Sequence, residues 1–364
     1  MHLMIHIIIM RDFMANKRKI EKTVASTPHI TESENMYIGI DLGTNHTAIT
    51  TSDGKKKSIL SIVGTPRDAI ASRYLKKEHL YGDEALKHRV ALNLFRPIES
   101  GVLKNQREDL EAAKGLLEYV LNSVDENDGR KKYAIIGVPA QASVLNKKII
   151  TEIAGDFFDG LMVASEPFCV AYNLGELMHA LIVDIGAGTT DLCRVHGTLP
   201  EPEDQISSNK AGDFIDKELV KLISNEYTNV SVNTDIVKKW KEQNSFVGEA
   251  MEEIVVDVAV DSSVLKLSIS KEIKNACEAI VPDIVNGISK LISTYDPDFQ
   301  EILRNNIWLA GGGSLIRNLD VFLEHELELI DGGKVRIDQD PVFSGADGAL
   351  KLAMDMPPEF WHTT

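Results

Sequence analysis

Two short segments of the chain repeat one pattern, and this repeat constrains the fold more than any other feature. Residues 38–44 read IGIDLGT and residues 182–190 read IVDIGAGTT. In each, an aspartate ends an apolar run and a glycine turn with threonines follows; the aspartates, Asp41 and Asp184, lie 143 residues apart. Such a spacing indicates two duplicated domains rather than a short-period array. The length of 364 residues agrees, since single cores usually stop growing at ~250–300 residues.

Apolar periodicity predicts alternating strands and helices in both halves. We expect strands from Tyr37 to about 60 with a turn at Asp53-Gly54, helices over 108–123, 143–157, 212–224, 272–294 and 315–329, and strands over 133–138 and 307–310. The predicted organisation is a flexible tail over 1–36, domain I over 37–180 with a small insertion at about 67–97, domain II over 181–345 with a small insertion at about 234–270, and a C-terminal helix and tail over 346–364 that return to domain I.

Composition and charge exclude several classes of protein. Apolar residues make up 43% and charged residues 26%, as in an ordinary soluble protein, and the net charge of −16 opposes binding to nucleic acid or to an anionic membrane. Three cysteines, Cys169, Cys193 and Cys277, are too few for a disulfide framework, which fits a reducing cytoplasm. The apolar residues 1–10 are shorter than the ~17 needed to span a bilayer. We interpret residues 1–13 as an upstream extension before a start at Met14, the alternative being a membrane or export role.

The glycine turns have the composition of a phosphate site. Glycine lets the backbone approach a phosphate and point its N–H groups at the oxygens, and threonine hydroxyls add donors. Asp41 and Asp184 are anionic and would repel a phosphate unless a cation lay between them. Mg²⁺ is commonly held by one or two carboxylates plus phosphates. A third element, residues 311–314 (GGGS), offers a flat surface for a base or an α-phosphate. The alternatives are ordinary hairpins and a flexible strand-to-helix connection.

At this point a resemblance becomes specific. DLGTNHT at 41–47, DIGAGTTD at 184–191 and GGGSLI at 311–316 resemble the phosphate-1, phosphate-2 and adenosine motifs of the actin, sugar kinase and heat-shock-70 superfamily. RPIESGVL at 96–103, IGVPAQAS at 136–143 and SEPF at 165–168 are similar to bacterial actins. The resemblance covers residues 37 to about 353. It implies an actin-like ATPase fold: two duplicated α/β domains, each a mixed five-stranded sheet with helices and a small inserted subdomain, around an interdomain nucleotide cleft.

The resemblance also implies roles for individual residues. Asp41 and Asp184 would hold Mg²⁺ through water, and Glu166 would orient or activate the attacking water, so these three are the expected catalytic residues. Glu166 could instead be only a helix N-terminal carboxylate, and Lys241-Glu242 only a solvated helix face. The residues expected to contact ATP or ADP are Gly43, Thr44, Asn45, His46, Gly186, Ala187, Gly188, Thr189, Gly212, Asp216, Lys241, Glu242, Gly311, Gly312, Gly313 and Ser314.

Within the superfamily, the chain is most similar to the magnetosome-aligning actins of magnetotactic bacteria. This resemblance rests on three stretches that are not needed for nucleotide binding: GTLPEPED at 197–204, KEQNSFVG at 241–248 and PPEFW at 357–361. The resemblance implies a cytoplasmic ATPase that polymerises with itself, head to tail, and organises magnetosomes through adaptor proteins, without binding nucleic acid or inserting into the membrane. The alternatives are a shape-determining or plasmid-segregating actin, a sugar kinase, and a static scaffold that binds nucleotide without turnover.

Overall fold

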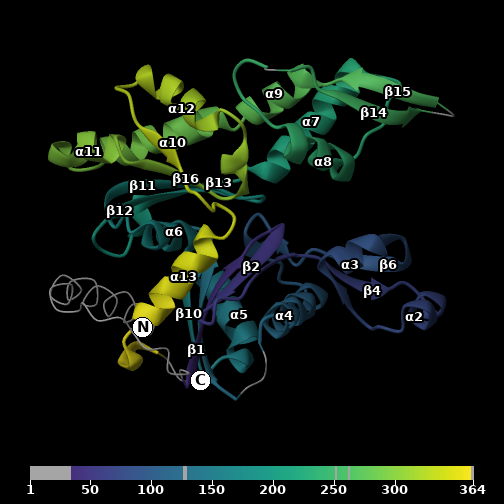
Figure 1. The fold of residues 1–364 in the computed structure, drawn as a ribbon, viewed down its shortest axis with the longest axis horizontal. Coiled ribbons are helices and arrows are strands. Elements are labelled where there is room, and N and C mark those ends of the chain that lie inside the picture. The colour runs from purple at the N-terminus through teal and green to yellow at the C-terminus, as the bar shows by residue number, and fades with distance from the viewer. Residues whose placement is uncertain (1–33, 126–128, 251, 261–262, 362–364) are drawn as a thin grey trace.

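The computed structural model describes residues 34–125, 129–250, 252–260 and 263–361. The interpretation of residues 1–13 and most of the predicted tail therefore lie outside the described residues. Two five-stranded mixed sheets form the centre of the molecule (Figure 1). The duplication predicted from the two aspartate turns is present.

The first sheet has the strand order β10-β9-β1-β2-β3. Its strands are β1 (Asn35–Leu42), β2 (His46–Thr51), β3 (Lys56–Leu60), β9 (Lys131–Val138) and β10 (Gly160–Ser165). The central strand β1 pairs antiparallel with β2 and parallel with β9. Because it is covered on both faces, β1 is apolar over most of its length, and Asp41 near its end is the exception.

The second sheet repeats this arrangement in the order β13-β12-β11-β16-β17. Its strands are β11 (Met178–Ile185), β12 (Thr190–His196), β13 (Gln205–Ser208), β16 (Ile307–Ala310) and β17 (Val335–Ile337). The central strand β11 again has an antiparallel hairpin partner, β12, and a parallel partner, β16. Asp184 therefore occupies in this sheet the place that Asp41 occupies in the first.

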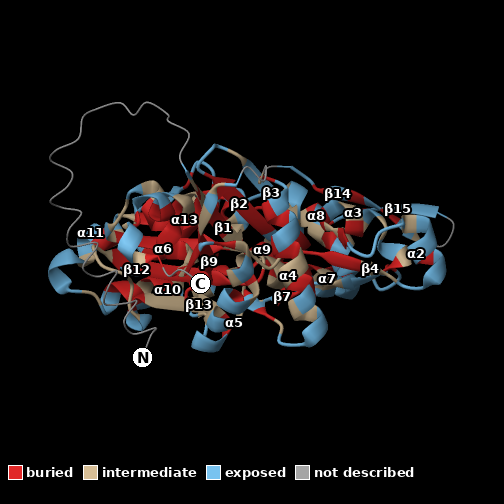
Figure 2. Cartoon of the chain, turned by 90° about the horizontal axis from the view of Figure 1, so that it is seen from below, coloured by how far each residue is buried: buried red, intermediate tan, exposed pale blue. Residues whose placement is uncertain are grey.

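Two helices join the halves at the centre of the molecule. They are α6 (Glu166–Leu174) and α13 (Ser344–Asp355), which pack on each other, while α13 also packs on β1 and β9. Figure 2 shows this region as buried, and Figure 1 shows α13, in yellow, lying against the first sheet although it comes from the far end of the sequence. The packing is close: a Cβ on Gly348 would lie 1.7 Å from the carbonyl oxygen of Cys169, so only glycine fits there.

Each half carries a small additional unit, and both lie on the same side of the molecule (Figure 1). The first unit contains β4 (Val63–Pro66), α2 (Ala69–Leu75), β5 (Leu80–Tyr81), α3 (Gly82–Lys87) and β6 (Leu92–Phe95). It has its own core of Ile62, Leu80, Ala85 and Leu92. The second contains α8 (Thr234–Asn244) and the hairpin β14 (Val255–Val260) and β15 (Ser263–Ser268). The first unit starts at Val63, slightly before the predicted insertion.

The structure differs from the sequence-based expectation at one helix. The single helix predicted over 272–294 is two helices, α9 (Ser270–Glu278) and α10 (Val281–Ser293). Pro282 lies in the first turn of α10, the place where proline's missing N–H costs least, so a new helix begins there. The third glycine element forms a short 3-10 turn, Gly312–Leu315, and α12 (Leu319–Glu328) begins only after Asn318, which has a φ of 64°.

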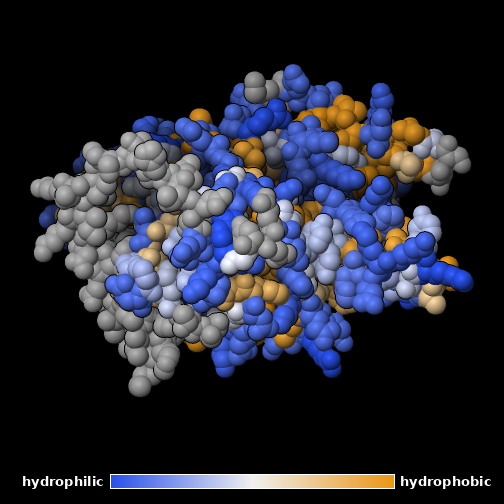
Figure 3. Space-filling view, turned by 60° about the horizontal axis from the view of Figure 1, so that its bottom comes forward, coloured by the Kyte–Doolittle hydropathy of each residue, from blue (hydrophilic) through white to orange (hydrophobic). Residues whose placement is uncertain are grey.

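The surface agrees with the charged composition. The face drawn in Figure 3 is mostly hydrophilic, with smaller hydrophobic areas. Within the described chain, every helix is too short or too polar to cross a bilayer. Cys169, Cys193 and Cys277 are buried and form no disulfide.

Candidate functional site

A cavity of about 350 Å³ lies between the two halves, where the turns that follow β1 and β11 meet. It is lined by residues from both sheets, from α6 and α8, and from the start of α13. Most of the residues predicted from the sequence line it: Asp41, Gly43, Thr44, Asn45, His46, Glu166, Asp184, Gly186, Ala187, Gly212, Lys241, Glu242, Gly311, Gly312 and Gly313.

Four predicted residues do not line the cavity: Gly188, Thr189, Asp216 and Ser314. Three of them, Gly188, Asp216 and Ser314, contact residues that do. A Cβ on Gly188 would lie 2.3 Å from Thr44 Oγ1, so the two turns contact each other directly. Asp216 forms an ion pair with Lys241, and the Ser314 hydroxyl donates to the Gly311 carbonyl at 2.7 Å. Thr189 is only 8% exposed, and its side chain hydrogen-bonds to Asp191.

Three carboxylates converge at one end of the cavity. Asp41 comes from β1, Asp184 from β11, and Glu166 is the first residue of α6. The start of α13 closes the same place, since a Cβ on Gly345 would lie 3.4 Å from Asp41 Oδ2 and 3.5 Å from Glu166 Cγ. Asp41 Oδ1 is buried and has no hydrogen-bond partner among the described residues. Acceptors without donors are costly when buried, so this cluster is incomplete without a positive group.

The pKa values of these carboxyls follow from the crowding. Burial raises the pKa of Asp41 to about 7, and the charge of Asp184 adds to the effect although a hydrogen bond with Glu166 opposes it. Burial, followed by the charge of Asp41, raises the pKa of Glu166 well above its usual value. Burial and the charges of Glu166, Asp191 and Asp338 do the same for the pKa of Asp184. A cation placed among them would remove this cost.

These carboxylates suit a metal ion only in a particular way. In the part of the chain that the structure describes, no group of three or more acidic, histidine or cysteine side chains is arranged to hold an ion directly. An ion would therefore need water or a ligand's oxygens to complete its shell. Mg²⁺ usually binds to proteins in this way, because it keeps several coordinated waters and takes one or two carboxylate ligands. The donor set of Asp41 and Asp184 suits Mg²⁺ in this respect, and binding through water stays a prediction.

Glycines bring the backbone close to the cavity on three sides. A Cβ on Gly43 would lie 2.6 Å from the His46 carbonyl oxygen. Gly311 has a φ of +72°, and a Cβ there would lie 2.3 Å from Asp184 Oδ1. Gly312 faces open space, since a Cβ there would meet nothing within 4 Å. Gly43 and Gly311 are therefore required by the close packing of the turns themselves, and Gly312 leaves the main chain open to a ligand.

Lys241 and Glu242 both line the cavity, where Lys241 is mostly buried and Glu242 is exposed. Lys241 Nζ lies 2.7 Å from Asp216 Oδ1 and donates to the Gly212 carbonyl at 2.8 Å. These contacts join α8 to the start of α7 (Gly212–Glu226). The start of α7 is also bonded to the glycine turn after β11. The Gly212 and Asp213 N–H groups donate to the Gly186 and Ala187 carbonyls of that turn.

Sequence reasoning missed other lining residues: Ser58, Asp213, Ile215, Lys238, Ser245, Leu315, Ile316, Pro341, Val342 and Gly345. Lys238 could have been found, since it lies three residues before Lys241 and so on the same helix face. Pro341 and Val342 follow β17 with no motif around them, and only the folded chain brings them to the site.

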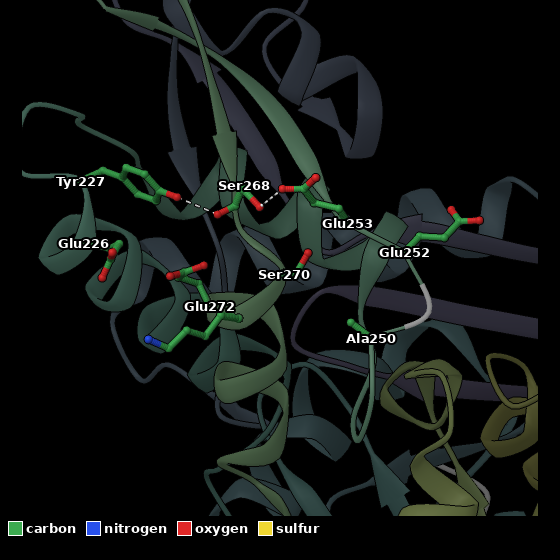
Figure 4. A pocket seen from close by; sticks show the side chains of 9 residues that line it. Glu226, Tyr227, Ala250, Glu252, Glu253, Ser268, Ser270 and Glu272 are labelled. Carbon is green, nitrogen blue, oxygen red and sulfur yellow. Dashed lines mark hydrogen bonds between the residues drawn. The ribbon is translucent and has the colours of Figure 1, made fainter.

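A second depression has the wrong charge for phosphate. It has a volume of about 530 Å³ and lies beside β15, α7 and α9 (Figure 4). Its described lining includes Glu226, Glu252, Glu253 and Glu272 but a single basic residue, Lys271. Two of its hydroxyl donors are used internally, as Tyr227 donates to the Ser268 carbonyl and Ser268 to Glu253. The cavity between the halves is therefore the better candidate for an anionic ligand.

Comparison with known proteins agrees with this geometry. A model of the family described as MreB/Mbl protein matches residues 35–358. The chain is 38% identical to the actin-like protein MamK of Paramagnetospirillum magneticum, over 90% of this chain and 94% of the relative. A solved MamK double helical filament superposes with a TM-score of 0.87 at 38% identity, covering 89% of this chain and all of the other. A non-polymerising MamK mutant bound to AMPPNP gives a TM-score of 0.70 at 38% identity, covering 88% of this chain and 99% of the other.

Proposed function

Since the chain belongs to the MreB/Mbl family and has the actin-like fold, we propose that it binds and hydrolyses ATP between its two halves and polymerises into filaments. One observation carries the proposal: Asp41, Glu166 and Asp184 converge beside glycine turns from both halves in one cavity. That pattern is what a metal-bound polyphosphate requires. A relative at 38% identity is known with the ATP analogue AMPPNP bound, and this supports the choice of ligand.

Asp41 and Asp184 would hold Mg²⁺ through water, because they end the two central strands and face the cavity from opposite halves. The ion supplies positive charge that offsets the charge of the phosphates. Asp41 has a buried oxygen that meets no donor among the described residues, and a cation would compensate it. Gly43, Thr44, Gly186 and Ala187 would contact the phosphates.

Glu166 would act on the attacking water. As the first residue of α6 it is fixed by the helix, and its side chain faces the cavity beside Asp41. A carboxylate there can accept a hydrogen bond from water and take its proton as the phosphorus–oxygen bond forms. The alternative interpretation of Glu166 was a carboxylate that only stabilises the N-terminus of a helix. A residue in the first turn of α6 can have that role and also act on water.

In the same cavity, Gly311, Gly312 and Gly313 would form the surface for adenine, and Lys241 with Glu242 would face the ribose. The contribution of Asp216 would be to hold Lys241 in place. This assignment leaves the phosphates at the carboxylate end of the cavity, next to Glu166.

Polymerisation and cellular role are inferred from the relatives. The filament-forming MamK structure and this chain align over nearly all of the former, so the surfaces that build such a filament have counterparts here. We propose a cytoplasmic filament of this chain that organises magnetosomes through adaptor proteins. Hydrolysis would change the angle between the halves and thereby weaken subunit contacts.

The test is sedimentation of the purified chain with ATP, with ADP or without nucleotide, each with Mg²⁺, and phosphate release measured in the same tubes. Pelleting that depends on ATP together with phosphate release is the expected result. Phosphate release without pelleting would favour a sugar kinase and would require a screen for hydroxyl substrates. ATP-dependent pelleting without release would instead favour a static scaffold.

A further inference from the structure

The cavity between the halves carries more negative than positive side chains. Its described lining has five carboxylates and two ammonium groups, from Asp41, Glu166, Asp184, Asp213 and Glu242, and from Lys238 and Lys241. A nucleoside triphosphate would bring further negative charge into this space. What each lysine contacts therefore decides which of them is available to a phosphate.

Lys241 is already neutralised. Its Nζ lies 2.7 Å from Asp216 Oδ1, and both side chains are largely buried, with 12% and 5% of their side-chain surfaces exposed. It also donates to the Gly212 carbonyl. Moving Lys241 away from Asp216 would leave a buried carboxylate without its partner. Lys241 therefore stabilises the second half and is not available to bind a phosphate.

Lys238 is placed differently. Within the described residues it forms no ion pair, and its Nζ donates instead to a neutral acceptor, the side-chain amide oxygen of Asn45, at 2.5 Å. Burial lowers the pKa of Lys238, while the charges of Asp213, Asp216 and Glu242 oppose this. An ammonium that is partly removed from water and contacts only an amide gains when a charged acceptor arrives.

The acceptor that Lys238 contacts belongs to the other half of the molecule. Asn45 lies in the turn after β1, whereas Lys238 lies on α8 of the second half. The same helix faces the first half at a second place, where Asp235 lies 4.0 Å from Arg96. The position of Lys238 across the cavity is therefore part of how α8 packs.

The turn after β1 has no permanent positive charge of its own. Residues 43–46 are Gly, Thr, Asn and His. Burial, followed by the charge of Lys238, lowers the pKa of His46, which keeps its imidazole neutral at physiological pH. A phosphate at this turn would meet N–H and hydroxyl donors from the first half and a side-chain cation only from the second.

We infer that Lys238 is a phosphate-binding residue whose ammonium moves from the amide oxygen of Asn45 to a phosphate oxygen of the bound nucleotide. This rests on the proposed ATP site and adds to it a contact between α8 and the phosphates. Because Lys238 and the turn after β1 belong to different halves, a phosphate bound at that turn would be contacted from both halves.

The test compares the full-length chain with Lys238→Met, Lys238→Arg and Lys239→Met. Lys239 is the exposed neighbour on the same helix, so its replacement controls for loss of one surface charge. Binding of AMPPNP, ADP and adenosine is measured with Mg²⁺ below the concentration that gives filaments. Lys238→Met should weaken AMPPNP and ADP binding ~10- to 100-fold, the range expected for losing a hydrogen bond to a charged group. Adenosine binding should stay within about 2-fold, Lys238→Arg should retain most of the affinity, and Lys239→Met should match the parent.

The inference is overturned if Lys238→Met binds AMPPNP as the parent does, or if it loses adenosine as strongly as AMPPNP, which would mark a structural role. Retained adenosine binding also shows that the variant is folded. If the parent binds neither AMPPNP nor ADP, the proposed function fails, and the inference fails with it.

Discussion

At the scale of single residues, the crowding of Asp41, Glu166 and Asp184 is unfavourable in itself. Each lies near another carboxylate in a region with little water, and burial raises the pKa of all three. Natural folds keep such arrangements where a ligand uses them. The proposed site explains why the chain tolerates this one.

Replacing Glu166 by glutamine should separate binding from hydrolysis. The amide keeps the size of the side chain but cannot accept a proton from water, so phosphate release should fall by about 100-fold or more. AMPPNP affinity should be unchanged or slightly higher, since one negative charge beside Asp41 is removed. The measurements are phosphate release and the disassembly rate of filaments, which should become slower. Glu166→Gln filaments that turn over as fast as those of the parent would exclude Glu166 as the residue that activates water.

The residues of the site differ in how far the sequence reveals them. Asp41, Asp184 and the glycines could be predicted, because a strand, an aspartate and a glycine turn form one local pattern that occurs twice. Lys238 is indicated only by its helical spacing from Lys241, and Val342 by no local pattern, since it reaches the cavity through packing of the segment after β17. Thr189 and Gly188 belong to the motif but do not line the cavity, because a tight turn directs only some of its residues to one side.

At the scale of elements, the loop after β12 is held by a buried charge cluster. Arg194 donates to Asp204 Oδ1 at 2.9 Å through Nε, and to the Leu291 carbonyl of α10. His196 Nε2 lies 3.1 Å from Asp204 Oδ2. Burial opposes ionisation of Asp204, but bonds from His196, the Glu201 N–H and Arg194 outweigh it and lower its pKa to about 2. The bond to Asp204 raises the pKa of His196.

This cluster predicts a pH-dependent contribution to stability. A histidine whose folded pKa is raised stabilises the folded state fully below about pH 6.5, and this contribution is lost as the pH rises through the folded pKa. His196→Gln should therefore lower the free energy of unfolding by roughly 0.5–1 kcal/mol at pH 6, with a smaller loss at pH 8. The check is chemical denaturation at several pH values. His325→Gln, at an exposed site, is the control and should show no such trend; equal losses by His196→Gln at both pH values would contradict the role of its charge.

The elements themselves were largely predictable from apolar periodicity, which places a strand at 307–310 as the structure does for β16. The helix over 272–294 was wrong because its apolar spacing continues through Pro282 while the backbone does not. The start of α12 was placed too early, since Gly312–Leu315 form a 3-10 turn against β11 before the helix begins. In both cases backbone geometry overrides a continuous side-chain pattern.

At the scale of the whole molecule, net charge opposes self-association. Each subunit carries a formal charge of −16, so bringing copies together costs electrostatic energy that salt screens. We expect the critical concentration for ATP-dependent pelleting to fall several-fold between ~0.01 M and ~0.15 M ionic strength, where the screening length drops from ~30 Å to ~8 Å. A critical concentration that rises with salt would show that attractive ion pairs between subunits dominate instead. Phosphate release below the critical concentration, measured at each salt level, controls for effects on the nucleotide site.

The packing of α13 has a consequence for how the protein is made. The first sheet begins at Asn35, yet the helix that covers β1 and β9 ends at Asp355. During synthesis the second sheet and its helices leave the ribosome complete, while the first half still lacks a helix of its core. The part of the protein translated first is therefore the part that finishes folding last, and a chain truncated before Ser344 would leave the first half, not the second, without its cover.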